Sequence, residues 1–113
     1  MPIDYTSFQD DDLVLPRANG DIDHDIAFST PGVDTTKNGV LSFEANPTSG
    51  TPTLELKING TSVYTQTSGN NVQRVVQENF SQNILQTNNT LKVKVTGNGT
   101  VAVSGFHVLF KAA

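Results

Sequence analysis

The chain has 113 residues, a formal net charge of −4 and no cysteine. Nucleic acid and anionic membranes are bound through clustered cations, and the 7 Lys and Arg residues are scattered, so neither partner is expected. The lack of cysteine excludes disulfides, thiol nucleophiles and zinc–thiolate sites.

The start of the chain carries no targeting signal that we can identify. Residues 1–12 lack the basic start and apolar stretch of a signal peptide, and no run approaches transmembrane length. We therefore expect one domain over residues 1–113, with residues 1–12 as a loosely ordered arm, no membrane contact and a cytoplasmic location by default.

Three strands are predicted in the first half of the chain. Residues 13–15 are a short apolar run that Pro16 closes, and residues 39–45 alternate between apolar and polar side chains. Residues 21–28 also alternate, which places acidic side chains on one face of a strand and mostly apolar ones on the other. The acidic face carries Asp21, Asp23 and Asp25.

Residues 53–67 predict a β-hairpin. Leu54, Leu56 and Ile58 alternate with charged residues, and Asn59-Gly60 suits the positive φ of a tight turn. A two-residue loop pairs Leu56 with Val63, whereas a four-residue loop pairs Ile58 with Val63. Both registers bury the same face, so the fold prediction does not depend on the choice.

The last third of the chain predicts a second hairpin. Residues 91–95 and 101–103 alternate on either side of Gly97-Asn98-Gly99, and a three-residue loop would pair Val95 with Val101. The alternation slips by one residue at Ser104-Gly105, which indicates a β-bulge. Residues 72–80 favour another strand, although the spacing of Val72, Val76 and Phe80 also fits a short helix.

About eight strands and no long helix predict an all-β fold. Turns rich in Gly, Asn and Pro separate short strands, as in a two-sheet antiparallel β-sandwich, and crossing connections between the sheets would make it a jelly roll.

The segment from Leu54 to Lys111 resembles the galactose-binding-like jelly rolls, and in particular the sugar-binding domain of family 2 glycoside hydrolases. Their pattern is a strand ending in Asn-Gly, a return strand, an aromatic residue, an Ile-Leu anchor and Asn before an alternating strand. Here it reads Leu56-Lys57-Ile58-Asn59-Gly60, Val63, Phe80, Ile84-Leu85 and Asn89-Thr90-Leu91-Lys92-Val93-Lys94-Val95. The resemblance implies a non-catalytic domain, because the catalytic residues of those enzymes lie in a separate barrel.

Carbohydrate is the ligand that this resemblance implies. Sugars are bound by an aromatic face with amide, guanidinium and carboxylate groups that read the hydroxyls. The residues of these types in the polar loops and the hairpin are Tyr64, Asn70, Asn71, Arg74 and Asn88, and Tyr5 is a second aromatic candidate. The alternative is that Tyr64 is a cross-strand packing residue and that the amides form turns.

The acidic strand face is a candidate calcium site. Ca²⁺ takes six to eight oxygen ligands, and Asp21, Asp23 and Asp25 with the nearby residues 10–12 could supply some of them. The alternative is a solvated acidic face that discourages edge pairing. His24 and His107 have no partner at a diagnostic spacing, so no enzymatic activity is expected.

The sequence therefore predicts a non-catalytic, lectin-like carbohydrate-binding domain. The alternative is a structural domain that acts through homo-oligomerisation or protein–protein contacts.

Overall fold

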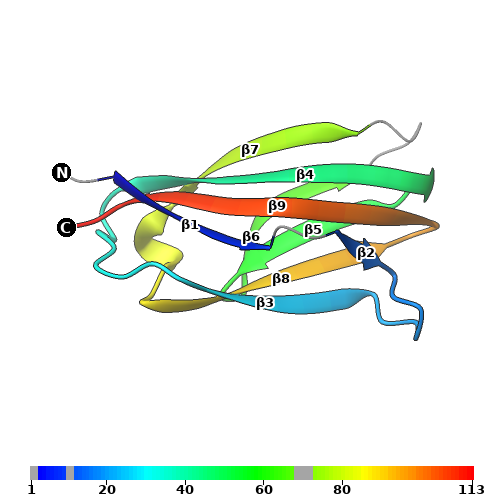
Figure 1. Ribbon diagram of the computed structural model, residues 1–113, viewed down its shortest axis with the longest axis horizontal. Helices are drawn as coiled ribbons and strands as arrows, with labels where there is room; N and C mark the ends of the chain where they lie inside the picture. The colour runs from blue at the N-terminus through cyan, green and yellow to red at the C-terminus, as the bar shows by residue number, and fades with distance from the viewer. Residues whose placement is uncertain (1–2, 10–11, 68–72) are drawn as a thin grey trace.

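The computed structural model describes residues 3–9, 12–67 and 73–113 as two antiparallel sheets packed face to face (Figure 1). One sheet contains β1 (Ile3–Gln9), β2 (Leu13–Leu15), β9 (Gly99–Lys111), β4 (Asn38–Gly50) and β7 (Arg74–Ser81). The other contains β3 (Asp23–Ser29), β8 (Asn88–Thr96), β5 (Thr53–Ile58) and β6 (Thr61–Thr67). A single 3₁₀ turn, η1 (Gln82–Ile84), precedes β8, and no helix among the described residues is long and apolar enough to cross a membrane.

The strand order confirms the predicted β-sandwich and its jelly-roll topology. The first sheet runs β1–β9–β4–β7, with β2 also paired to β9, and the second runs β3–β8–β5–β6. These are the two interleaved four-strand sheets of a jelly roll. Nine strands fill eight positions because β1 and β2 lie along the same edge of β9. Residues 3–9, which we expected in a loose arm, instead pair with β9 as β1.

The core lies between the sheets, and the alternation of each strand supplies it. Strands β5, β8 and β9 each turn their apolar side chains inward, as the period of two predicts. Phe43 and Phe106 stack at the centre, with ring centroids 5.3 Å apart. The burial of this apolar surface is the main stabilising contribution to the fold.

The predicted β5–β6 hairpin is present, with a register that combines a tight turn and a bulge. Asn59 and Gly60 both have positive φ, and Ile58 pairs with Thr61 across them. The register then shifts by one residue, so Tyr64 rather than Val63 stands opposite Leu56. Neither of the two predicted pairings of Val63 is found.

The predicted hairpin between residues 91–95 and 101–103 is wrong. These segments belong to β8 and β9, which lie in different sheets. Val95 pairs with Leu54 on β5, whereas Val101 pairs with Leu15 on β2 and with Pro47 on β4. Both segments have one buried face, so their alternation fits a sheet-crossing connection as well as it fits a hairpin.

The predicted bulge at Ser104-Gly105 is confirmed. The β4–β9 register shifts at this point, and Gly105 has φ +64, a conformation that glycine adopts without strain. The segment that could have been a short helix is strand β7, which pairs with β4 over its whole length. Val72 lies outside the described residues.

Asn89 is one of three buried polar residues in the described part of the chain, and it connects several loops. Its side-chain NH₂ donates to the Thr30 hydroxyl (3.0 Å) and to the Gln86 carbonyl (2.9 Å). Its Oδ1 accepts from the Gln86 N–H (2.7 Å) and from Asn59 Nδ2 (2.9 Å). The amide therefore fixes the 82–87 connection against the β5–β6 turn. Asn59 and Asn89, which belong to the sequence pattern that resembles the sugar-binding jelly rolls, thus act as structural residues here.

Gln82 makes a second buried connection at the same end of the sandwich. Its Nε2 donates to the carbonyls of Asp34 (2.7 Å) and Lys111 (3.0 Å), and its Oε1 accepts from the Lys111 N–H (2.8 Å). The side chain is fully buried and joins η1, the loop before β4 and the end of β9.

Candidate functional site

The edge formed by β6 and β7 brings together two of the predicted ligand-binding residues. Strand β6 is the last strand of one sheet, β7 is the last strand of the other, and the two are in contact. Tyr64 on β6 is half-buried, and its ring meets Phe43 edge-on, with centroids 5.3 Å apart. Arg74 and Glu78 come from β7, and both are half-buried.

The Tyr64 phenol lies in the field of both charged residues. Burial raises its pKa above the ordinary value, and this is the largest effect. The Arg74 charge opposes the increase in pKa, the Glu78 carboxylate adds to it, and a side-chain hydrogen bond with Arg74 opposes it. A phenol, a guanidinium and a carboxylate therefore act on one another at this edge, which we call the β6–β7 site.

Glu78 is the residue of this site that the sequence analysis missed. Alternation along β7 places Arg74, Val76 and Glu78 on one side of the strand, and all three are half-buried. The alternation along β7 is visible in the sequence, but the packing of β7 against β6 was needed to show which side of the strand faces Tyr64.

Asn88, a further predicted ligand-binding residue, does not join the β6–β7 site. Asn88 is exposed at the start of β8, where its Oδ1 accepts from the Ser29 hydroxyl (3.3 Å) on β3. In the four-stranded sheet, β6 forms one edge, whereas β3 forms the opposite edge and β8 lies next to it. Asn70 and Asn71 lie outside the described residues.

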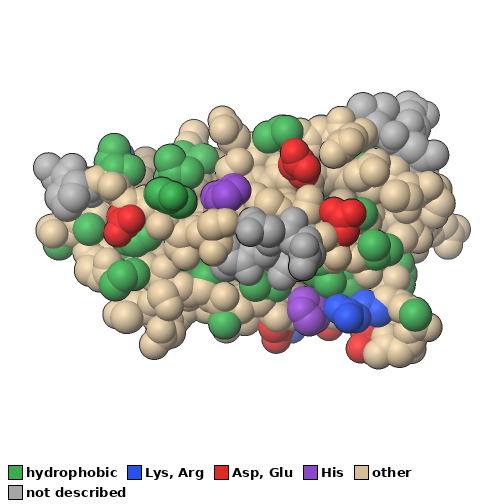
Figure 2. Space-filling view, in the orientation of Figure 1, with side chains coloured by type: hydrophobic (Ala, Val, Ile, Leu, Met, Phe, Trp, Pro, Cys, Tyr) green, Lys and Arg blue, Asp and Glu red, His purple; other side chains and the backbone are tan. Residues whose placement is uncertain are grey.

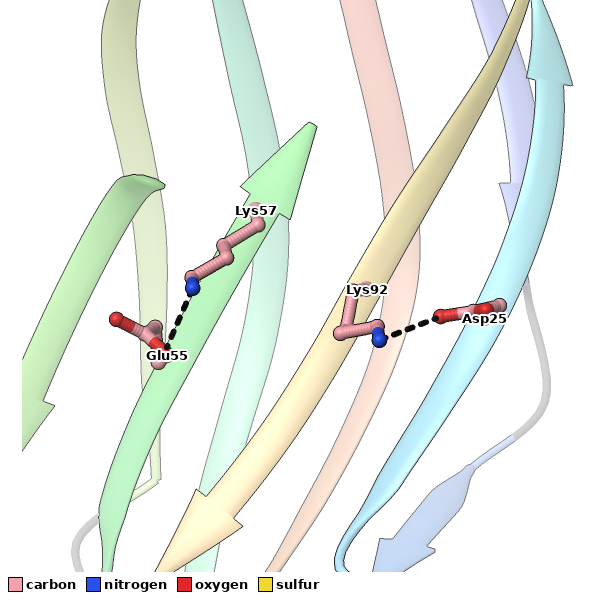
Figure 3. Close-up of polar contacts among 4 residues, drawn as sticks. All are labelled: Asp25, Glu55, Lys57 and Lys92. Carbon is pink, nitrogen blue, oxygen red and sulfur yellow. Dashed lines mark ion pairs between the residues drawn. The ribbon is translucent and has the colours of Figure 1, made fainter. Parts of the chain in front are cut away.

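Two of the three aspartates of the predicted calcium site stand opposite lysines. Asp21 lies before β3, and its carboxylate accepts from Asn19 Nδ2 (3.0 Å). Asp25 forms an ion pair with Lys92 at 4.0 Å (Figure 3), and Asp23 stands opposite Lys94 in the β3–β8 register. Within residues 3–9, 12–67 and 73–113, no three His, Asp or Glu side chains form a group that could hold a metal ion.

Strand β8 therefore supplies cations to the acidic face of β3. Figure 3 shows Lys92 directed at Asp25, while Lys57 is directed at Glu55 at 3.9 Å. Asp10 and Asp11 lie outside the described residues, so calcium binding stays a prediction.

We expect Asp25→Asn to change the free energy of unfolding by less than about 1 kcal/mol, because exposed ion pairs contribute little. Urea unfolding of both proteins, with calcium and with a chelator, measures this. A calcium-dependent stabilisation that Asp25→Asn removes would favour the metal site instead.

The two histidines line separate surface hollows. His24 lines a hollow of about 410 Å³ together with Asp12 and Arg17, beside β2. His107 lines one of about 260 Å³ with Ser42 and Glu44, next to the β9 bulge. Neither hollow contains a residue of the β6–β7 site.

Comparison with known proteins supports the fold. No family model matches the chain, and no curated protein matches it. The chain is similar, across 97% of its length, to part of dimeric latent PorU from Porphyromonas gingivalis, with a TM-score of 0.79 and 10% identity. Across 99% of its length it is also similar to part of a chain in the structure of infectious bursal disease virus Gx strain, with a TM-score of 0.55 and 13% identity.

The chain spans 13% of the PorU chain and 32% of the viral chain. At these identities the similarity concerns the fold alone. The likeness to the sugar-binding domain of family 2 glycoside hydrolases stays a prediction.

Proposed function

We propose that this chain is a non-catalytic, lectin-like carbohydrate-binding domain whose ligand site is the β6–β7 site. The observation that carries the proposal is the meeting of Tyr64, Arg74 and Glu78 at the sandwich edge. An aromatic ring, a guanidinium and a carboxylate are groups that bind sugar rings and their hydroxyls.

Each of the three side chains has a distinct part in this proposal. The half-buried Tyr64 ring is held by Phe43 and offers its remaining surface to the apolar face of a sugar. Arg74 donates to ring or hydroxyl oxygens, and Glu78 accepts from hydroxyl groups. Because the two charges are opposite, the site favours a neutral sugar over a charged one.

A glycan array followed by calorimetry tests the proposal. We expect Arg74→Ala to weaken sugar binding by about 10- to 100-fold, since hydrogen bonds to charged groups contribute roughly 1.5–3 kcal/mol. Tyr64→Phe keeps the packed ring and removes only the hydroxyl, so its loss of affinity measures the phenol without disturbing the core.

Tyr5→Ala is the control, because Tyr5 is the other candidate aromatic residue and lies on β1, at the opposite edge of the five-stranded sheet from β7. A sugar that binds Arg74→Ala and Tyr64→Phe as tightly as the unaltered chain would show that the site is wrongly placed. An array with no binding, with or without calcium, would count against carbohydrate as the ligand.

A further inference from the structure

An apolar patch lies on the outer face of the five-stranded sheet, away from the β6–β7 site. Tyr5, Leu109 and Val40 follow one another across β1, β9 and β4, and Ile3 lies two residues before Tyr5. Ile3 and Tyr5 are each 67% exposed, and Leu109 is 43% exposed. Figure 2 shows hydrophobic side chains gathered toward this end of the face, at the left of the view.

The outer face of the four-stranded sheet has the opposite character. Its central strands carry Glu55, Lys57, Lys92 and Lys94, and β3 adds Asp23 and Asp25. A charged face of this kind remains solvated, whereas clustered exposed apolar side chains mark a contact surface. The apolar patch therefore distinguishes one outer face of the sandwich from the other.

The patch contains both a protruding side chain and a hollow. Tyr5 projects from the edge strand β1, and beside it lies a hollow of about 190 Å³. The hollow is lined mainly by apolar residues, together with two amides and Lys111. Its lining includes Ile3, Val40, Leu109, Asn38 and Asn79.

We propose that this patch binds a second copy of the same chain, with Tyr5 of each copy seated in the hollow of the other. A two-fold contact requires a surface that is complementary to itself, and a protrusion next to a hollow meets that requirement. A two-fold axis at Leu109, the middle of the row, sets Leu109 against its equivalent and Tyr5 of each copy against Val40 of the other, which lines the hollow. No like charges are then brought together at the centre.

The chemistry of the hollow suits a tyrosine. An interface tyrosine buries its ring among apolar groups while its hydroxyl finds a polar partner. The side chains of Ile3, Val40 and Leu109 supply the first, and the amides of Asn38 and Asn79 supply the second.

The size of the face is sufficient for a dimer. Four strands about 4.8 Å apart and the 13 residues of β4 at about 3.3 Å each give roughly 19 Å by 43 Å. This corresponds to about 800 Å² for each copy, which is the area of a standard protein interface.

Sedimentation velocity over a concentration series, from about 5 µM to about 500 µM, tests the proposal. We expect a reversible monomer–dimer equilibrium in the unaltered chain. Tyr5→Ala should weaken it by about 30-fold, the loss typical of a central aromatic contact. Leu109→Asp should abolish it, because the axis would bring two carboxylates together.

Ile22→Asp is the matched control, since Ile22 is 41% exposed, close to the value of Leu109, but precedes β3 in the other sheet. It should dimerise like the unaltered chain, and circular dichroism should show all three variants folded. A chain that is monomeric throughout, or a dimer unaffected by Tyr5→Ala and Leu109→Asp, would overturn the proposal. Sugar binding at the β6–β7 site is measured separately and does not depend on the outcome.

Discussion

Gln82→Ala is expected to lower the free energy of unfolding by about 3–5 kcal/mol. The substitution removes a fully buried side chain and its three hydrogen bonds, which leaves the Lys111 N–H without that partner. The carbonyls of Asp34 and Lys111 each lose one of two partners and keep a backbone N–H. Each buried polar group left unsatisfied costs roughly 1–3 kcal/mol, and the cavity adds to this. Urea unfolding followed by circular dichroism measures the change.

Gln86→Ala is the control for this experiment, because Gln86 is exposed four residues further along the chain. We expect it to change the free energy of unfolding by less than about 0.5 kcal/mol, as surface substitutions usually do. Similar losses in both variants would mean that the three hydrogen bonds of Gln82 do not hold the loops together.

Asn89→Ala is expected to lower the free energy of unfolding by about 2–4 kcal/mol. Its side chain makes four hydrogen bonds with Thr30, Asn59 and the backbone of Gln86. Removing it leaves the Gln86 N–H without its partner, whereas the Thr30 hydroxyl, the Gln86 carbonyl and the Asn59 amide each keep another hydrogen bond. A group left unpaired where water does not reach it costs roughly 1–3 kcal/mol, and the lost hydrogen bonds and the cavity add to this. The same unfolding measurement gives the value.

Asn89→Asp and Asn88→Ala complete the test. Asn89→Asp keeps the shape and the acceptor but loses both donors, so it should destabilise at neutral pH although it leaves no cavity. Asn88→Ala changes the exposed neighbour and should be nearly neutral. If Asn89→Asp leaves the free energy of unfolding unchanged, the two donated hydrogen bonds contribute nothing to stability.

The sequence predicted well the strands that have one buried face. Alternation of Leu54, Leu56 and Ile58 identified β5, and the slip at Ser104-Gly105 identified the bulge in β9. Asn59-Gly60 identified the one tight hairpin turn. These signals are local, and local geometry is what a sequence pattern specifies.

Strand partners could not be predicted with the same success. Val95 and Val101 are six residues apart, yet they pair with Leu54 and Leu15 in separate sheets. Which distant strand pairs with a given strand depends on how the whole core packs. For the same reason the sequence could not show that lysines on β8 stand opposite Asp23 and Asp25.

The candidate site was predicted in part. Tyr64 and Arg74 were selected for their chemistry, and the fold brings them together across the β6–β7 edge. Glu78 was missed because its orientation depends on tertiary packing. Asn88 was included on its residue type alone, and the strand order places it on β8, which is separated from β6 by β5.

The central position of β9 in its sheet has a consequence for how the chain folds during synthesis. Strand β9 joins β1, β2 and β4, yet it comes last in the order of strands. Among the described strands, β5–β6 is the only pairing between consecutive strands. Until residues 99–111 have left the ribosome, three strands therefore lack their shared partner. Folding must wait for long loops to close, which is slow and leaves strand edges open to aggregation in the meantime.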